Sequence, residues 1–158
     1  MNNKNKFYLV YCLDNLIKLC LVFMMITIAL LTFYQVIMRY GFNQSSSWSE
    51  EAIRFTFIWC SFLGVAMGVR EKSHIGISIL VELFNQKVQR YVEVVGYLAI
   101  MIFAGYLMYY GWKVVIATST QTSPALGVPM SLIYLSVPVM ACLIFFYSFI
   151  EIIHPKNN

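Results

Sequence analysis

Residues 19–38 read LCLVFMMITIALLTFYQVIM, and this stretch decides the fold class. It holds 20 residues without a charged side chain, and its polar groups are Gln35 and two threonines. A helix of about 20 apolar residues covers a hydrocarbon core of roughly 30 Å, so the stretch predicts a membrane-spanning helix. Its apolar core is longer than the roughly 7 to 15 residues typical of a secretory signal, so we expect it to be retained.

The rest of the chain has the same apolar character. Hydrophobic residues make up 60% of the sequence and charged residues 11%, against about 45–50% and 25% in an ordinary soluble domain. The mean hydropathy is +0.72. Three further charge-free runs cover residues 55–69, 94–112 and 132–150. We therefore predict an all-α membrane protein, one domain over residues 1–158, with transmembrane helices at about 19–39, 48–70, 90–113 and 130–152.

The distribution of positive charge predicts the orientation. Eight of the 11 lysines and arginines lie in the two terminal tails and in the connection between the second and third spans. The positive-inside rule then places both termini in the cytoplasm, in a multi-pass protein of the bacterial inner membrane. This asymmetry explains the net charge of +4, so nothing supports a nucleic-acid partner.

Residues 75–90, between the second and third spans, have an amphipathic pattern. Leu80, Phe84 and Val88 recur at helical spacing, and polar residues recur on the opposite side. Such a pattern predicts a helix lying along the cytoplasmic membrane surface. Alternatively, the later half of the segment forms the first turns of a long third span, and both interpretations can hold for different halves.

The densest charge cluster, SSSWSEEAIR at residues 45–54, stands at the start of the second span. Ser47 and Glu50 have the spacing of a capping box, and Glu50 and Arg54 are four residues apart and can pair. Helix capping and one ion pair could account for the whole cluster. Glu51, however, has no partner at helical spacing, and Trp48 is a large ring at the interface. Charges at membrane depth are tolerated mainly where they face protein, so the cluster could equally be a partner surface.

Several kinds of chemistry are not indicated. No nucleotide-binding, hydrolase or metalloprotease motif is present, the two histidines lie outside the predicted spans, and the four cysteines are expected to be free thiols. We expect no cofactor, no metal and no enzymatic activity. None of the charge-free cores holds an ionisable group, so the chain is expected to need a partner to energise transport. Small residues within the spans would let helices approach closely: Gly64, Ala66, Gly68, Gly105 and Gly111.

Two segments carry a family resemblance. Residues 35–77, QVIMRYGFNQSSSWSEEAIRFTFIWCSFLGVAMGVREKSHIGI, and residues 121–138, QTSPALGVPMSLIYLSVP, frame most of the chain. They resemble the small membrane subunit (Q subunit, DctQ-like) of tripartite ATP-independent periplasmic (TRAP) transporters. The family often has proline after the amphipathic segment, whereas this chain reads Leu83-Phe84-Asn85-Gln86, which leaves the bend before the third span open.

The resemblance implies a function in sodium-coupled, binding-protein-dependent import of an organic acid, either sialic acid or a C4-dicarboxylate, with overall similarity leaning to the sialic-acid branch. A large elevator-type membrane subunit, expected as a separate chain because this one stops after the fourth span, would bind substrate and Na⁺. A periplasmic substrate-binding protein would dock transiently. The present subunit, surrounded by membrane lipid, would brace the stationary scaffold.

The candidate contact residues for these partners gather at the predicted periplasmic end: Arg39, Trp48, Glu50, Glu51, Arg54, Trp59, Gln121, Ser123 and Pro124. Two rival functions remain. The chain could be a self-sufficient homo-oligomeric exporter or channel, or it could be the membrane anchor of a redox enzyme.

Overall fold

The computed structural model describes residues 3–44, 46–71 and 86–153. The elements in chain order are α1 (Asn3–Gly41), α2 (Ser47–Arg70), α4 (Gln86–Ala117), α5 (Met130–Tyr134) and α6 (Ser136–Ile153). Four helical spans are long and apolar enough to cross a membrane, the fourth being α5 and α6 together. This confirms the predicted all-α membrane fold. Within the described ranges, the one β contact is an isolated bridge between Thr122 and Pro129.

The amphipathic segment is only partly within view. Residues 75–85 lie outside the described residues, and residues 86–90 form the first turns of α4. For that later part, the alternative of an extended third helix is therefore the one observed. Helix α1 likewise extends well beyond its apolar run of 20 residues. Its 39 residues, at about 1.5 Å per residue, span about 58 Å.

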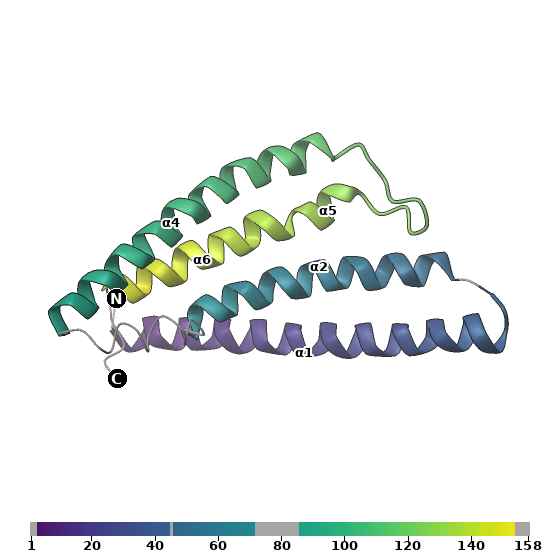
Figure 1. Cartoon of the computed structure of the whole chain (residues 1–158), viewed down its shortest axis with the longest axis horizontal. Helices are drawn as coiled ribbons and strands as arrows, with labels where there is room; N and C mark the ends of the chain where they lie inside the picture. The colour runs from purple at the N-terminus through teal and green to yellow at the C-terminus, as the bar shows by residue number, and fades with distance from the viewer. Residues whose placement is uncertain (1–2, 45, 72–85, 154–158) are drawn as a thin grey trace.

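The helices form an open row. Helix α6 lies between α4 and α2, and α1 packs on the far side of α2, so the order across the row is α4, α6, α2, α1 (Figure 1). The start of α1 and the end of α6 lie at one end of the row, which we call the terminal end. The α1–α2 and α4–α5 connections lie at the other, which we call the loop end (Figure 1).

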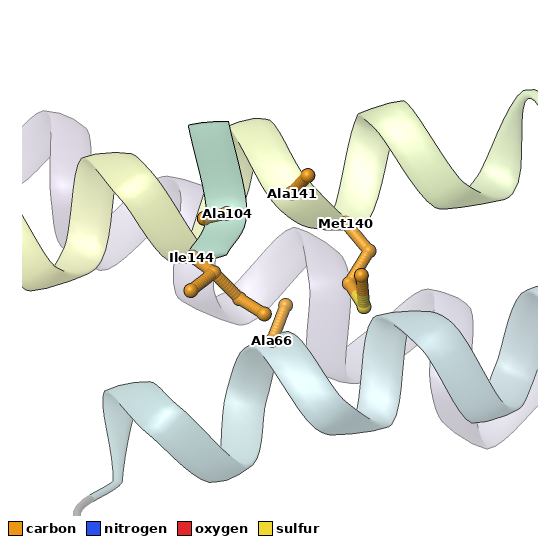
Figure 2. Close-up of a cluster of buried hydrophobic side chains, with 5 residues drawn as sticks. All are labelled: Ala66, Ala104, Met140, Ala141 and Ile144. Atoms are coloured by element: carbon orange, nitrogen blue, oxygen red, sulfur yellow. The ribbon is translucent and has the colours of Figure 1, made fainter. Parts of the chain in front are cut away.

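Small side chains allow α6 to approach both of its neighbours. Ala66 of α2, Ala104 of α4 and Ala141 of α6 are almost fully buried, and Met140 and Ile144 fill the space between them (Figure 2). A second cluster lies nearer the terminal end, where α1, α2 and α6 meet. Eight of the 18 residues of α6 are buried, which makes it the central helix of the row.

Pro138 explains why the fourth span is divided at Leu135. Proline has no backbone N–H to donate to the carbonyl four residues earlier, here that of Tyr134, and its ring crowds that carbonyl. Helix α4 fits against this break at Gly111, where an added Cβ would lie 3.1 Å from Cδ of Pro138 and 3.2 Å from Cγ1 of Val137. The expected close helix approach is therefore seen at Gly111.

The remaining small residues of the prediction behave differently. Ala66 is buried in the core, whereas a Cβ added at Gly64, Gly68 or Gly105 would meet no atom of the described chain within 4 Å beyond the adjoining residues and backbone of its own helix. All four cysteines are free, as expected.

Candidate functional site at the loop end

The first connection at the loop end is a tight turn. Asn43 has a positive φ of 52°, a conformation that asparagine tolerates better than most residues, and Gln44 donates its backbone N–H to the carbonyl of Met38 at 3.0 Å. Arg39 stands in the last turn of α1, where the negative end of the helix dipole favours a cation. The turn thus brings Arg39 close to the start of α2.

The N-cap of helix α2 is one residue earlier than the capping-box pattern of the sequence predicts. Ser46 is the N-cap and Ser47 the first helical residue, so Ser49, and not Glu50, occupies the third helical position. The predicted capping box of Ser47 with Glu50 is therefore wrong, because Glu50 stands one residue too far along the helix. Ser49 donates its hydroxyl to the carbonyl of Ser46 at 2.8 Å, and the N-cap makes no side-chain bond.

Glu51 is the residue that connects the two halves of the loop end. Its carboxylate oxygen Oε2 accepts the backbone N–H of Ala125 at 3.0 Å and that of Leu126 at 2.7 Å. Only 8% of Glu51 is exposed. Hydrogen bonds to an ionised carboxylate are among the stronger ones in proteins, so Glu51 fixes the α4–α5 connection on the first turns of α2. We call this arrangement the Glu51 clasp.

The α4–α5 connection is shaped to present those two N–H groups. Ser123 donates its N–H to the carbonyl of Val128 at 2.9 Å, its hydroxyl accepts the N–H of Val128 at 3.1 Å, and its carbonyl accepts the N–H of Gly127. Gly127 has a φ of +66°, which favours glycine. Met130 closes the loop by donating to the carbonyl of Gln121. The buried Ser123 therefore stabilises the loop from inside, while Pro124 lies exposed at its tip.

Two open grooves lie beside the clasp and share Glu50 and Arg54. The first, here called the rim groove, has a volume of about 790 Å³ between the ends of α1 and α2 and the α4–α5 connection. Trp48 and Tyr34 line it, with ring centroids 5.7 Å apart. The second, here called the arginine groove, has a volume of about 570 Å³ between α1 and α2 and contains Arg39.

The structure brings together most of the predicted contact residues but not all. Arg39, Trp48, Glu50, Glu51, Arg54 and Pro124 surround the two grooves. Trp59 lies elsewhere: its Nε1 donates to the carbonyl of Leu132 at 3.2 Å, and its ring packs against the second core cluster. Within the described chain, Glu50 and Arg54 do not form the predicted ion pair, and both side chains are exposed.

Sequence reasoning missed a charged network at the terminal end. Arg70 donates from Nε to Oδ2 of Asp14 at 3.0 Å, and its Nη1 lies 3.9 Å from Oε2 of Glu151. The guanidinium also lies 5.7 Å from the centroid of the Tyr147 ring. This network joins α1, α2 and α6. The available signal was that Asp14, Arg70 and Glu151 each border an apolar run, at helix ends that four spans bring to the same side of the membrane.

Charged side chains are exposed at the loop end. Glu50, Arg39 and Arg54 present exposed charges beside apolar and aromatic surface, which is suited to contact with protein or lipid. Across the described ranges, histidine, cysteine, aspartate and glutamate form no group of three that could hold a metal ion.

Comparison with known proteins points in one direction. Residues 28–155 match the model of the family described as tripartite ATP-independent periplasmic transporters, DctQ component. A TRAP transporter small permease protein from Haemophilus influenzae is 26% identical over 140 residues, covering 86% of this chain and 84% of the relative.

Two further relatives carry names that mention a solute. The C4-dicarboxylate TRAP transporter small permease protein DctQ of Vibrio cholerae is 30% identical over 100 residues, covering 63% of this chain and 43% of the relative. The sialic acid TRAP transporter permease protein SiaT of Haemophilus influenzae is 24% identical over 112 residues, covering 71% of this chain and 18% of the relative.

Proposed function

The chain belongs to the DctQ family of TRAP transporter components, and we propose that this small permease subunit braces a large, elevator-type membrane subunit during import of an organic acid. It is a multi-pass protein of the inner membrane, in a family of transporter components and not of enzymes. The proposed cargo is a C4-dicarboxylate or sialic acid, because relatives are named for both. The proposed transport is driven by sodium, and the large subunit binds both substrate and Na⁺.

The open row of helices is the observation that carries the bracing role. Helices α1 and α4 are the outer members of the row, and their large apolar side chains are exposed along most of their length. In a bilayer such surface meets either lipid or another transmembrane protein. An elevator mechanism needs a stationary element that is not dragged along with the moving domain. A flat unit four helices wide would enlarge that element.

The loop end offers a contact surface for the partners. We assign this contact to the rim groove, where Trp48, Glu50 and Pro124 are exposed beside one another. Exposed aromatic rings with nearby charge are typical of protein interfaces. The large subunit is the proposed permanent partner, and the periplasmic binding protein is the proposed transient one. Glu51 and Ser123 support this surface from within the chain.

The deciding experiment is reconstitution with and without the small subunit. Liposomes containing the large subunit would be supplied with binding protein, substrate and a sodium gradient, and insertion of the large subunit would be checked by protease protection. Uptake should require the present chain. Sodium-driven uptake of equal rate in its absence, with the large subunit correctly inserted, contradicts the bracing function.

Two further arms test the contact surface and the rival function. Trp48→Ala should reduce co-purification with the large subunit or reduce uptake, whereas Phe149→Ala, which removes an exposed ring from the central helix α6 outside the rim groove, serves as the control. Liposomes containing only the present chain should move no solute. Transport by the isolated chain would instead support a self-sufficient exporter or channel.

A further inference from the structure

Two positively charged side chains line the arginine groove. Arg39 of α1 and Arg54 of α2 both line it, both are exposed, and within residues 3–44, 46–71 and 86–153 neither guanidinium has an ion pair or a side-chain hydrogen bond. Glu50 also lines the groove, so the three charged side chains sum to one positive charge. Guanidinium groups at the edge of a membrane are stabilised when they reach phosphate.

The lining of the groove changes in character along the helix axes. Val36 lies about one helical turn deeper than Arg39, and Phe57 about one turn deeper than Arg54, because α1 runs toward the loop end and α2 runs away from it. Glu50 lies about one turn nearer the loop end than Arg54. Arg39, two residues before the end of α1, and Glu50, three residues after the start of α2, therefore lie at a similar depth near the loop end, and Arg54 lies about one turn deeper. The apolar side chains of Val36 and Phe57 lie deeper than the arginine of their own helix, with Gln35 as the one polar neighbour of Val36 in the lining.

We propose that the arginine groove binds one phospholipid, with its phosphodiester between Arg39 and Arg54 and an acyl chain along Val36 and Phe57. The charges of the groove complement phosphatidylethanolamine: the ammonium meets Glu50, the phosphate meets the guanidiniums, and the chain lies along the apolar side chains. Arginine suits this task because its planar fork can bond two phosphate oxygens at once. This assignment is independent of the transport function proposed above.

The arginine groove suits a lipid because it opens toward the membrane-facing surface of α1 and α2. Val36 and Phe57 are exposed at 48% and 59%, so the apolar wall is continuous with the membrane-facing surface of the two helices. A soluble anion would leave this wall uncovered, whereas an acyl chain covers it. The bound lipid would also fill the gap between α1 and α2 close to the loop end, and so hold the two helices at a fixed separation there.

The test measures lipid retention by the full-length chain. Native mass spectrometry of the purified protein should show one phosphatidylethanolamine per chain after delipidation in mild detergent. Arg39→Gln and Arg54→Gln should each lower retention at least fivefold, and the double variant at least tenfold. Lys113→Gln, which removes the same charge from α4 outside the groove, should leave retention unchanged. Equal retention by wild type and double variant overturns the proposal.

Three further arms use the wild-type chain and do not depend on the folding of variants. Diacylglycerol with the same acyl chains should bind at least tenfold more weakly than phosphatidylethanolamine, and equal binding overturns the role of the phosphate. Sodium phosphate should not displace the lipid, and full displacement would make this a free-anion site. Loss of the lipid on complex formation with the large subunit would show that protein occupies the groove instead.

Discussion

At the residue scale, Glu50 and Glu51 are neighbours with opposite environments. The carboxylate of Glu51 is buried and accepts two backbone N–H groups from the α4–α5 connection, whereas Glu50 is exposed between the two grooves. Two adjacent acids thus have separate tasks. One stabilises the chain itself, and the other is available to a ligand or partner.

This difference gives a matched pair of variants. Glu51→Ala removes the acceptor of two hydrogen bonds and should lower the free energy of unfolding by about 2 kcal/mol, the order expected for bonds to a charged group. Glu50→Ala should change it little, because its side chain is exposed. Unfolding of the full chain in mixed micelles, followed by tryptophan fluorescence, measures both. Equal destabilisation by the two variants would show that the clasp is not the source of the effect.

Arg70 at the terminal end is a second residue with a defined task. Removing one member of a partly buried ion pair leaves the other charge without compensation, at a cost of roughly 3 kcal/mol. Arg70→Gln should therefore destabilise the chain by about this amount, and adding Asp14→Asn should recover part of the loss. A double-mutant cycle in the same unfolding assay measures the coupling. Strict additivity of the two substitutions would argue against the pair.

Glu71 provides a pH-dependent test. It follows α2 directly and pairs with Lys18 at 2.6 Å, and the hydrogen bond and positive charge of Lys18 hold the pKa of Glu71 below its usual range. Because the folded-state pKa is the lower one, the pair stabilises the fold above the unfolded-state pKa. That contribution is lost as pH falls through the folded-state pKa.

The corresponding substitution is Lys18→Gln, which should raise the pKa of Glu71 toward its ordinary value. A titration of its carboxyl carbon by NMR measures the shift. Arg90→Gln is the control, because Arg90 contacts the carbonyl of Ile152 and takes no part in this pair. The effect on stability should be small, since both side chains are about half exposed. An unchanged Glu71 pKa in Lys18→Gln would contradict the assigned cause.

At the element scale, the contact of α4 with α6 depends on one missing side chain. Gly111 lies against the break at Pro138, while Gly105, less than two turns earlier on the same helix, has open space around it. Gly111→Leu should force the two helices apart and cost about 1–3 kcal/mol, as overpacking commonly does. Gly105→Leu should be neutral or stabilising, because leucine is the better helix former. If both variants have the same stability, the contact at Gly111 is loose.

Helix identity could be predicted from the sequence because it depends on local composition. A charge-free run of about 20 residues needs no knowledge of its neighbours to be assigned to a membrane span. Helix length was less accessible: α1 continues to Asn3 through a polar segment, and the start of α2 differs by one residue from the cap that the serines indicated. Boundaries depend on tertiary contacts, which sequence periodicity does not contain.

The candidate site was predictable as a set of residues but not as a set of contacts. Arg39, Trp48, Glu50 and Arg54 lie together because a short connection must bring the end of α1 to the start of α2. The partners of Glu51 lie 74 and 75 residues away and are backbone groups, so no pattern of side chains in the sequence could predict these hydrogen bonds. The Asp14–Arg70 pair joins two side chains, and it was missed because its residues lie 56 positions apart in the sequence.

At the scale of the whole molecule, the open row leaves little buried surface. Ten hydrophobic residues of the described chain are buried, and most of them belong to α2 and α6. Helices in a bilayer gain little from apolar contact alone, because lipid tails are equally apolar. The isolated subunit should therefore be only marginally stable in detergent, and a bound large subunit should raise its apparent stability by mass action.

Thermal unfolding of the chain alone and in complex measures this effect. The midpoint should rise in the complex and should also depend on the concentration of the large subunit. An unrelated membrane protein, solubilised in the same detergent and added at the same concentration, is the control. A midpoint that is the same alone and in complex would mean that the row is stable without its proposed partner.

The Glu51 clasp also has a consequence for biosynthesis. The ribosome synthesises α1 and α2 well before residues 125 and 126. When α2 reaches the membrane, the two N–H groups that bind Glu51 in the folded chain do not yet exist, and its side chain is hydrated. Its desolvation must wait until the second hairpin has been inserted and the α4–α5 connection has reached the loop end. The Glu51 clasp can therefore form only after the loops of both hairpins have reached the same side of the membrane. Crosslinking from position 51 to residues 125 and 126 in nascent chains of increasing length would show when this topology is complete.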